Sequence, residues 1–562
     1  MPLSLRSGGR MMASVAEQSE HKPWPMKRVV AASSAGTAFE WYDFFIFGSL
    51  ATTIQKVFFA GLNPTAGLIA ALGLFAAGFA FRPLGAIIFG VIGDRVGRKG
   101  AFLATVSLMG GATFLIGLLP TYASAGIISP ILLILLRICQ GIALGGEYGG
   151  AAIYVAEHAP NNRRGFMTGW IQITASIGLI AGLLVILGTR TAVGEDGFLA
   201  WGWRVPFLIS VILLAISVWM RVKLSESPAF AKLKADGDVT KTPLRESFAQ
   251  WSNLRRVLIA FFGIMCAQGA VWYLTFFYVQ VFLTRSLGVP EATKDMMVLT
   301  VTVASAPLYV FFGWLSDRVG RKPVMLGGML LALLAYNPGF HGIAAAANPA
   351  LVEAQQRRPV EVHADPATCS AQFDPVGTRR FDSSCDIAKS LLASTGISYA
   401  NRPFVGDEAV IAVGTQQVAV PDGRGLDTAG LKALKDVTGK QVKAALAAEG
   451  YPDQAAAHAM NLPVMLFWMM VFAVAATALY GPQAAALVEM FPTRVRYTAM
   501  SLPYHVGTGW IGGFLPVTSF AIVAITGNIY ASLWYPAFFT AVSAVVCLVF
   551  VKETKGKPLE DC

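Results

Sequence analysis

The stretch Gly90-Val-Ile-Gly-Asp94-Arg95-Val-Gly97-Arg98-Lys99 returns later in the chain as Gly313-Trp-Leu-Ser-Asp317-Arg318-Val-Gly320-Arg321-Lys322. Both copies have the pattern G-x-x-x-D-R-V-G-R-K, and each follows a long apolar run. A second, looser repeat places an acid before two arginines in each half: Glu157, Arg163 and Arg164, then Glu489, Arg494 and Arg496. Repetition of this kind predicts two halves with related structures.

Apolar runs separate these charged segments. Of the 562 residues, 55% are apolar and 14% are charged, whereas soluble domains carry about 25% charged residues. A helix needs roughly 20 apolar residues to cross about 30 Å of hydrocarbon. We therefore predict an all-α membrane protein with twelve transmembrane helices in two six-helix halves, over 30–54, 66–92, 102–121, 128–155, 165–190, 202–222, 257–284, 295–316, 323–343, 463–488, 498–526 and 531–551.

Lysine and arginine gather in alternate loops, which predicts orientation because cytoplasmic loops are enriched in them. The basic segments include both copies of the repeated loop and the central stretch that runs from Arg221 to Arg256. We expect both termini in the cytoplasm and the chain in a bacterial-type inner membrane. The net charge of +11 then reflects topology, and we expect no nucleic-acid partner.

The predicted divisions follow from these spans. They are a cytoplasmic tail (1–29), a first six-helix half (30–222), a cytoplasmic linker (223–256), helices seven to nine (257–343), an extracytoplasmic insert (344–461), helices ten to twelve (463–551) and a cytoplasmic tail (552–562).

The insert between helices nine and ten is polar and nearly charge-balanced. Alternating apolar residues at Ala409–Val420 indicate strands, and the stretches near 387–392 and 431–448 indicate helices. We expect a small folded domain, with a disordered loop as the alternative. Cys369 and Cys385 would form a disulfide in an oxidising compartment, or remain two free thiols.

The repeated loop is the signature of the major facilitator superfamily, and further stretches resemble one family within it, the metabolite:proton symporters. These stretches are Phe39–Phe45, Phe81–Gly85, Arg137–Gly141 with Gly145–Gly150, and Trp201–Phe207. The resemblance covers about 30–340 and 463–555. It implies carriers of the α-ketoglutarate, citrate, shikimate or proline/betaine type. We expect no long C-terminal coiled coil of the kind that the proline/betaine branch has, and the best-known members lack the insert.

Ionisable residues inside spans are costly, so they indicate a functional interior. Glu40 and Asp43 lie three residues apart on one helix face and are candidates for proton coupling, or for structural pairing with Arg82 or Arg137. Arginine binds carboxylates with two parallel hydrogen bonds, which makes both arginines candidates for substrate contact. The resemblance associates Arg137 and Gln140 with proton coupling. The remaining candidates are Glu147, Gln268, Trp272, Tyr273, Tyr278, Gln280, Tyr504 and His505.

The repeated loops are better explained as a gate. We expect Asp94 to meet the N-terminus of helix eleven, and Asp317 that of helix five, because helix N-termini favour negative charge. We also expect Arg98 to pair with Glu157, and Arg321 with Glu489, when the inner face is closed. The full predicted gating set is Gly90, Asp94, Arg95, Gly97, Arg98, Glu157, Arg164, Gly313, Asp317, Arg318, Gly320, Arg321, Glu489 and Arg494.

The sequence therefore predicts a secondary transporter, with proton-coupled symport of a small organic acid as the leading function. The alternatives are symport of a zwitterion such as proline or betaine, and a solute sensor of the same fold. We expect no enzymatic activity, cofactor or metal, since the sequence holds no phosphate-loop pattern and no C-x-x-C pair. The expected partners are a small solute, protons and the lipid bilayer, with a monomer as the working unit.

Overall fold

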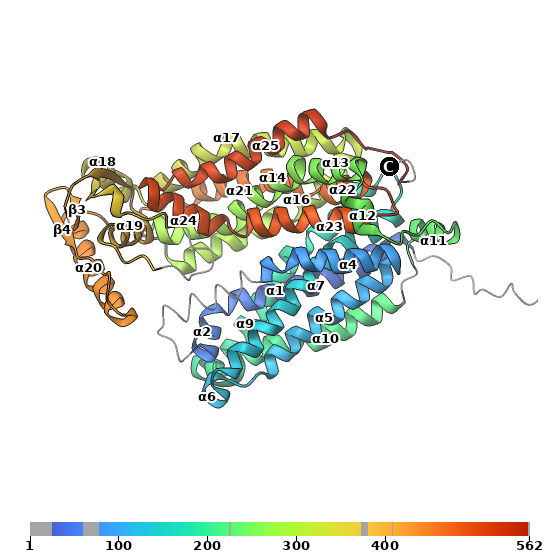
Figure 1. The fold of residues 1–562 in the computed structure, drawn as a ribbon, viewed down its shortest axis with the longest axis horizontal. Coiled ribbons are helices and arrows are strands. Elements are labelled where there is room, and N and C mark those ends of the chain that lie inside the picture. Colours follow the sequence, from blue (N-terminus) through green and yellow to red (C-terminus); the bar gives the residue numbers. More distant parts are fainter. Residues whose placement is uncertain (1–24, 60–77, 224–225, 373–379, 407, 560–562) are drawn as a thin grey trace, which may run out of the picture.

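The computed structural model describes residues 25–59, 78–223, 226–372, 380–406 and 408–559. Two helical bundles lie side by side and meet at the end that carries the C-terminus (Figure 1). The first bundle consists of α1 (Met26–Ser49), α2 (Ala51–Phe58), α4 (Arg82–Arg95), α5 (Arg98–Leu118), α6 (Tyr122–Ala125), α7 (Ile128–His158), α8 (Arg164–Gln172), α9 (Thr174–Gly197) and α10 (Arg204–Val222), with a π-helical turn at Phe198–Gly202.

A linker with two short helices, α11 (Pro228–Ala235) and α12 (Pro243–Phe248), leads to the second bundle. That bundle begins with α13 (Trp251–Ala260), α14 (Cys266–Tyr273) and α15 (Val279–Val281), which π-helical turns join into one rod. It continues with α16 (Glu291–Val319), α17 (Arg321–Ala347), α21 (Leu462–Tyr480), α22 (Gln483–Met490), α23 (Arg496–Val506), α24 (Leu515–Thr526) and α25 (Trp534–Phe550), with a π-helical turn at Gly507–Gly512 and a 3₁₀ turn at Ala531–Leu533.

Nine helical segments within the described residues are long and apolar enough to cross a membrane: 98–118, 128–158, 164–202, 204–222, 251–286, 291–319, 321–347, 462–490 and 531–550. Each coincides with one of the expected spans. Of the other three, the first corresponds to α1, and the eleventh to α23 and α24 with the π-helical turn between them. The start of the second, and most of the N-terminal tail, lie outside the described residues. The total of twelve stays a prediction.

The repeated glycines shape both copies of the loop. Gly97 has a φ of 137° and Gly320 a φ of 119°, a region that glycine enters without steric cost. They precede α5 and α17, so each loop reverses the chain at the same place in its bundle. Gly90 and Gly313 serve a different purpose, because a Cβ on Gly90 would lie 2.9 Å from the Thr498 Cα and one on Gly313 2.4 Å from the Gly165 oxygen. Both permit close contact between the two halves.

The insert folds as a small α/β unit. It contains α18 (Pro349–Arg357), β1 (Val360–Ala364), a 3₁₀ turn at Pro366–Thr368, α19 (Ser384–Thr395), β2 (Tyr399–Pro403), β3 (Ala409–Val413), β4 (Gln416–Val420) and α20 (Thr428–Ala448). The sheet order is β2-β1-β3-β4, with β1 and β2 parallel and the other pairs antiparallel. The predicted strand region is the β3–β4 hairpin, and both predicted helical stretches lie within α19 and α20.

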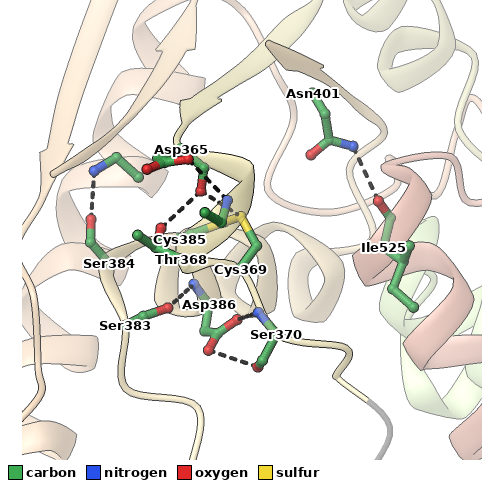
Figure 2. The surroundings of a disulfide bond; sticks show 12 residues. Asp365, Thr368, Cys369, Ser370, Ser383, Ser384, Cys385, Asp386, Asn401 and Ile525 are labelled. Carbon is green, nitrogen blue, oxygen red and sulfur yellow. Dashed lines mark hydrogen bonds between the residues drawn. A yellow bond between two sulfur atoms is a disulfide. The ribbon is translucent and has the colours of Figure 1, made fainter. Parts of the chain in front are cut away.

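A disulfide joins Cys369 to Cys385 at the start of α19, as expected from the sequence (Figure 2). The Asp386 carboxylate beside it accepts hydrogen bonds from the backbone nitrogen and hydroxyl of Ser370, both 2.8 Å long. The insert contacts the second bundle through β2, where the Asn401 amide donates to the Ile525 carbonyl (3.2 Å) and the Tyr399 hydroxyl to the Ala524 carbonyl (2.6 Å). The insert is thus anchored to the end of α24.

Candidate functional site

Asp94 joins the two halves at the end of α4. Its buried carboxylate accepts hydrogen bonds from the backbone nitrogens of Tyr497 (3.1 Å) and Thr498 (2.8 Å), which open α23. The Arg98 Nη1 atom donates to the same carboxylate at 2.5 Å. A negative charge at a helix N-terminus is stabilised by the unpaired amides and by the helix dipole. This is the position that the sequence predicted for Asp94.

Asp317 makes the corresponding junction in the other direction. Its carboxylate accepts from the backbone nitrogens of Gly165 (2.9 Å) and Phe166 (2.7 Å), at the start of α8. The Arg321 Nη1 atom donates to it at 2.6 Å. The repeat in sequence is therefore a repeat in structure, and each half inserts one carboxylate into a helix N-terminus of the other.

The expected pairing of Arg98 with Glu157 is wrong. Arg98 donates to the Gly93 carbonyl (2.6 Å) and the Thr493 carbonyl (2.7 Å) besides Asp94. Glu157 instead accepts from the Arg496 Nη1 atom at 2.7 Å. The reason is geometric: Asp94 lies at the end of α4, just across the loop from Arg98 at the start of α5, and takes its guanidinium, while Arg496 reaches Glu157 from the opposite half.

The second expected pair is present in a larger cluster. The Glu489 Oε1 atom accepts from Arg321 Nη2 at 3.2 Å and from Arg164 Nη1 at 2.7 Å. The remaining gating candidates lie at the margin of this junction. Arg95 is exposed, Arg318 stacks on the Trp314 ring, and Arg494 pairs with Asp238 and Glu246 of the linker.

Two acids that the sequence did not single out complete the repeated loops. Glu226 accepts from the Arg98 backbone nitrogen (3.1 Å), and Glu553 from the backbone nitrogens of Arg321 and Lys322, both at 3.0 Å. Each acid caps the N-terminus of the helix that follows the loop. Glu226 follows the sixth expected span and Glu553 follows the twelfth, so the two acids occupy equivalent positions in the two halves. A comparison of the two halves in sequence could therefore have identified them.

A buried ion cluster lies within the first bundle. Arg221, on α10, donates to Glu40 (Nη1 to Oε1, 3.1 Å) and to Glu147 (Nη2 to Oε1, 2.7 Å). The Thr105 hydroxyl donates to the second oxygen of Glu147 at 2.7 Å, and the guanidinium stacks on the Phe102 ring. The sequence counted Arg221 among the charges of the central cytoplasmic segment, but the structure buries its side chain within the first bundle. The side chain points into the bundle because α10 packs against α5 and α1.

Asp43 belongs to a separate polar chain. It accepts from the Ser210 hydroxyl at 2.5 Å and also bonds the Thr113 hydroxyl. Gln140 donates to Thr113 at 2.7 Å and accepts from Arg137 at 2.7 Å. Residues three apart on a helix are offset by about 60° around its axis, enough to send Glu40 and Asp43 to different partners. The suggested pairing of these acids with Arg82 or Arg137 is not what the structure has: Glu40 pairs with Arg221, and Asp43 bonds two hydroxyls.

Arg82 lies between the two halves and is only 3% exposed. Its guanidinium lies over the rings of Phe44 (4.7 Å) and Phe79 (4.2 Å) and hydrogen-bonds Tyr273 of the second bundle. Its Nε and Nη2 atoms are buried and have no hydrogen-bond partner among the described residues. A buried charge with vacant donors is costly unless an anion fills them. Arg82 therefore has the properties of a substrate contact.

Aromatic side chains surround this position from both halves. Tyr504 stacks on Tyr148 with ring centres 3.7 Å apart, and its hydroxyl lies 3.0 Å from that of Tyr480. The Trp272 ring lies tilted against that of Tyr480, with ring centres 6.2 Å apart, and its Nε1 atom donates to the Tyr309 hydroxyl at 2.9 Å. The electrostatic influence of Arg82 extends to Tyr504 and to its neighbour His505. The sequence pointed to four of these second-half residues, Trp272, Tyr273, Tyr504 and His505.

The other second-half candidates have partners within their own bundle. The Tyr278 hydroxyl bonds Ser532 at 2.6 Å, and the Gln280 amide bonds the Phe276 carbonyl. The Gln268 Oε1 atom is buried without a hydrogen-bond partner in the described part of the chain. Within that same part, no group of three histidine, cysteine or acidic side chains has an arrangement that would hold a metal ion.

Two family models match the chain. The model described as "Sugar (and other) transporter" matches residues 29–246 and 443–562, and the model "Major Facilitator Superfamily" matches 260–352. Residues 353–442, most of the insert, lie outside both matches.

Curated relatives have transporter names. The proline/betaine transporter of Salmonella typhimurium is 37% identical over 55% of this chain and 63% of its own length, so the chain spans less than two thirds of that relative. The shikimate transporter of Escherichia coli is 36% identical over 57% of this chain and 73% of its own length. A putative metabolite transport protein of Haemophilus influenzae is 30% identical over 95% of this chain and 96% of its own length.

Solved structures share the fold. The proton:xylose symporter XylE superposes with a TM-score of 0.60 and 16% identity, over 95% of this chain and 98% of the other. At that identity the similarity concerns the fold alone. Together, the matched models, the relatives and the paired junctions place the chain in the sugar (and other) transporter family of the major facilitator superfamily, among its metabolite:proton symporters.

Proposed function

We propose that the chain is a secondary active transporter that carries a small solute together with protons across a bacterial inner membrane by alternating access. The observation that carries this proposal is Arg82: a buried arginine between the two halves, with two vacant donor nitrogens among the described residues. A solute carboxylate that enters from one side would accept those hydrogen bonds. Because Arg82 also contacts Tyr273, a solute bound to Arg82 would link the first half to the second.

The gate in this proposal is the junction around Asp94 and Asp317. Its hydrogen bonds join opposite halves, so they exist only while that face is closed. A carrier alternates between closing this face and closing the other one. We place this face, and both termini, in the cytoplasm, because lysine and arginine are concentrated there.

The proton carriers in this proposal are the buried acids of the first bundle. Glu40 and Glu147 share a single arginine, and Asp43 bonds two hydroxyls. The first cluster therefore holds two carboxylates against one positive charge. Such a cluster accepts one proton without losing its ion pair, which is the property that symport with protons requires.

The leading solute is a small organic acid, consistent with relatives named for shikimate and other metabolites. A zwitterion such as proline or betaine is a second candidate, favoured by one observation. Tyr148 stacks on Tyr480 and Tyr504, Trp272 lies tilted against Tyr480, and this aromatic group is near Arg82. Aromatic faces attract alkylammonium groups. Arg82 would hold the carboxylate of either solute.

The test is uptake by liposomes that contain the purified chain, with labelled carboxylates and betaines under an imposed proton gradient, with and without protonophore. We expect uptake of one solute that depends on the gradient, and its loss in Arg82→Gln. Arg255→Gln removes an exposed arginine and should transport normally. Uptake that is insensitive to the protonophore would exclude proton coupling. No uptake of any solute by folded protein would favour the sensor alternative.

A further inference from the structure

A pocket of about 810 Å³ lies outside the site described above, at the closed end of the molecule. The linker helix α12 and the start of α13 form one wall, and the loop before α23 forms the other. Polar side chains line it: Arg245, Gln250, Ser252, Asn253, Arg256 and Arg494. No role in the transport cycle proposed above uses this pocket.

The charges in this pocket do not balance. Arg494 is neutralised by Glu246, 2.8 Å away, and by Asp238. Arg245 and Arg256 have no carboxylate within ion-pair distance in the described chain, and the Nη1 atom of Arg256 is buried without a hydrogen-bond partner there. The three arginines at this pocket outnumber Glu246 and Asp238 by one, and both of these carboxylates pair with Arg494, so Arg245 and Arg256 have no acid of their own here. A buried donor of this kind is stabilised by an anion.

The donors match a phosphate. Guanidinium groups bind phosphate oxygens through two parallel hydrogen bonds, and two arginines lie on neighbouring helices around one cavity. The Gln250 amide and the Ser252 hydroxyl supply neutral groups at the same wall. We propose that this pocket is a binding site for a phosphate-bearing anion, with Arg245 and Arg256 as its charged donors.

The position of α13 indicates one source of this anion. Trp251, at the start of the membrane-crossing segment 251–286, is 67% exposed, and tryptophan favours the depth of lipid headgroups. Leu258 and Phe262 continue the exposed apolar surface away from the pocket. A phospholipid at this place would lay its chains along that surface and its headgroup among the arginines. A soluble phosphate compound is the other source with the same chemistry.

An occupied pocket would also affect the gate. Its wall contains Pro492, Arg494 and Val495, in the short loop between Glu489 and Arg496. These last two residues form ion pairs with the opposite half. A ligand that fixes this loop to the linker therefore stabilises the closed junction.

The test measures the thermal unfolding midpoint of the full chain in detergent. Three compounds are titrated: short-chain phosphatidylglycerol, an uncharged monoacylglycerol of the same chain length, and glycerol 3-phosphate. We expect phosphatidylglycerol to raise the midpoint saturably and the monoacylglycerol to have no saturable effect. In Arg245→Gln/Arg256→Gln the apparent dissociation constant should rise at least about tenfold, since two charge-assisted hydrogen-bonding groups are lost.

The matched control is Lys241→Gln/Arg255→Gln, which removes the same charge from exposed positions outside the pocket and should bind as the unmodified chain does. If the double variant does not fold, the exposed Arg245 is changed alone, with a several-fold weakening expected. A response to glycerol 3-phosphate that depends on both arginines supports the site and identifies its ligand as soluble. No response to either phosphate compound, or an unchanged response in the arginine variants, overturns the proposal.

Discussion

Replacing Asp94 by asparagine should open the junction between the two halves while leaving each half folded. The carboxylate accepts three hydrogen bonds: from Arg98, and from the backbone nitrogens of Tyr497 and Thr498. Asparagine has nearly the same shape, so packing at this buried position is retained. The substitution removes the negative charge and one of the two acceptor atoms.

The magnitude follows from the two bonds that cross between the halves, those from the Tyr497 and Thr498 nitrogens, because Arg98 lies in the same half as Asp94. Hydrogen bonds to a charged group contribute about 1.5–3 kcal/mol, against about 0.5–1.5 kcal/mol for neutral pairs. Losing roughly 1 kcal/mol at each of these two bonds destabilises the closed junction by about 2 kcal/mol. Since about 1.4 kcal/mol corresponds to a tenfold change, the ratio of closed to open molecules should fall by about thirtyfold. Only the closed state contains these bonds, so the stability of each separate half should change little.

The assay is a distance measurement between spin labels on the exposed residues Asn162 and Arg318, which lie on opposite halves. Asp94→Asn should shift the distribution toward longer distances and abolish solute uptake. Asp295→Asn removes an exposed acid whose side chain is 68% accessible and should leave both measurements unchanged. A distance distribution in Asp94→Asn identical to that of the unmodified chain, or normal uptake, would refute the reasoning.

Three further predictions concern other parts of the molecule. Arg221→Gln leaves two buried carboxylates without their counter-charge and should cost about 3–5 kcal/mol; an unchanged thermal midpoint would contradict this, and neutralising both acids as well should restore stability. Replacing Cys369 and Cys385 by serine should destabilise the insert by about 3 kcal/mol, because the bridge closes a loop across 16 positions; limited proteolysis should then cut the insert faster and leave the helical bundles intact. Hydrogen bonds from Arg402 hold the pKa of Glu361 below its usual range. That stabilisation is complete above the usual carboxyl pKa of about 4.3 and is lost as the pH falls through the lower folded value. Glu361→Gln removes this titrating group, so the stability of its insert should depend less on pH as the pH falls below about 4.3. Proteolysis of the insert at a series of acidic pH values measures this difference.

The sequence determined the features that depend on local composition and on internal repetition. Long apolar runs define helices by their length, and nine of the expected spans coincide with described helices that are long and apolar enough to cross a membrane. The repeated loops predicted where Asp94 and Asp317 lie, because a repeat in sequence implies equivalent positions in two related bundles. Alternation and turn residues within the insert predicted its hairpin and its two longer helices.

Only the tertiary structure decided which charged residues meet. In the sequence, Arg221 resembles any other basic residue at the end of an expected span. In the structure it is buried and pairs with both Glu40 and Glu147. Glu157 pairs with Arg496 instead of Arg98. Partner choice of this kind depends on the rotation of each helix about its axis and on which distant helices pack together. Neither quantity is encoded in hydropathy, which records how much of a helix is apolar and says little about the neighbour that each face will meet.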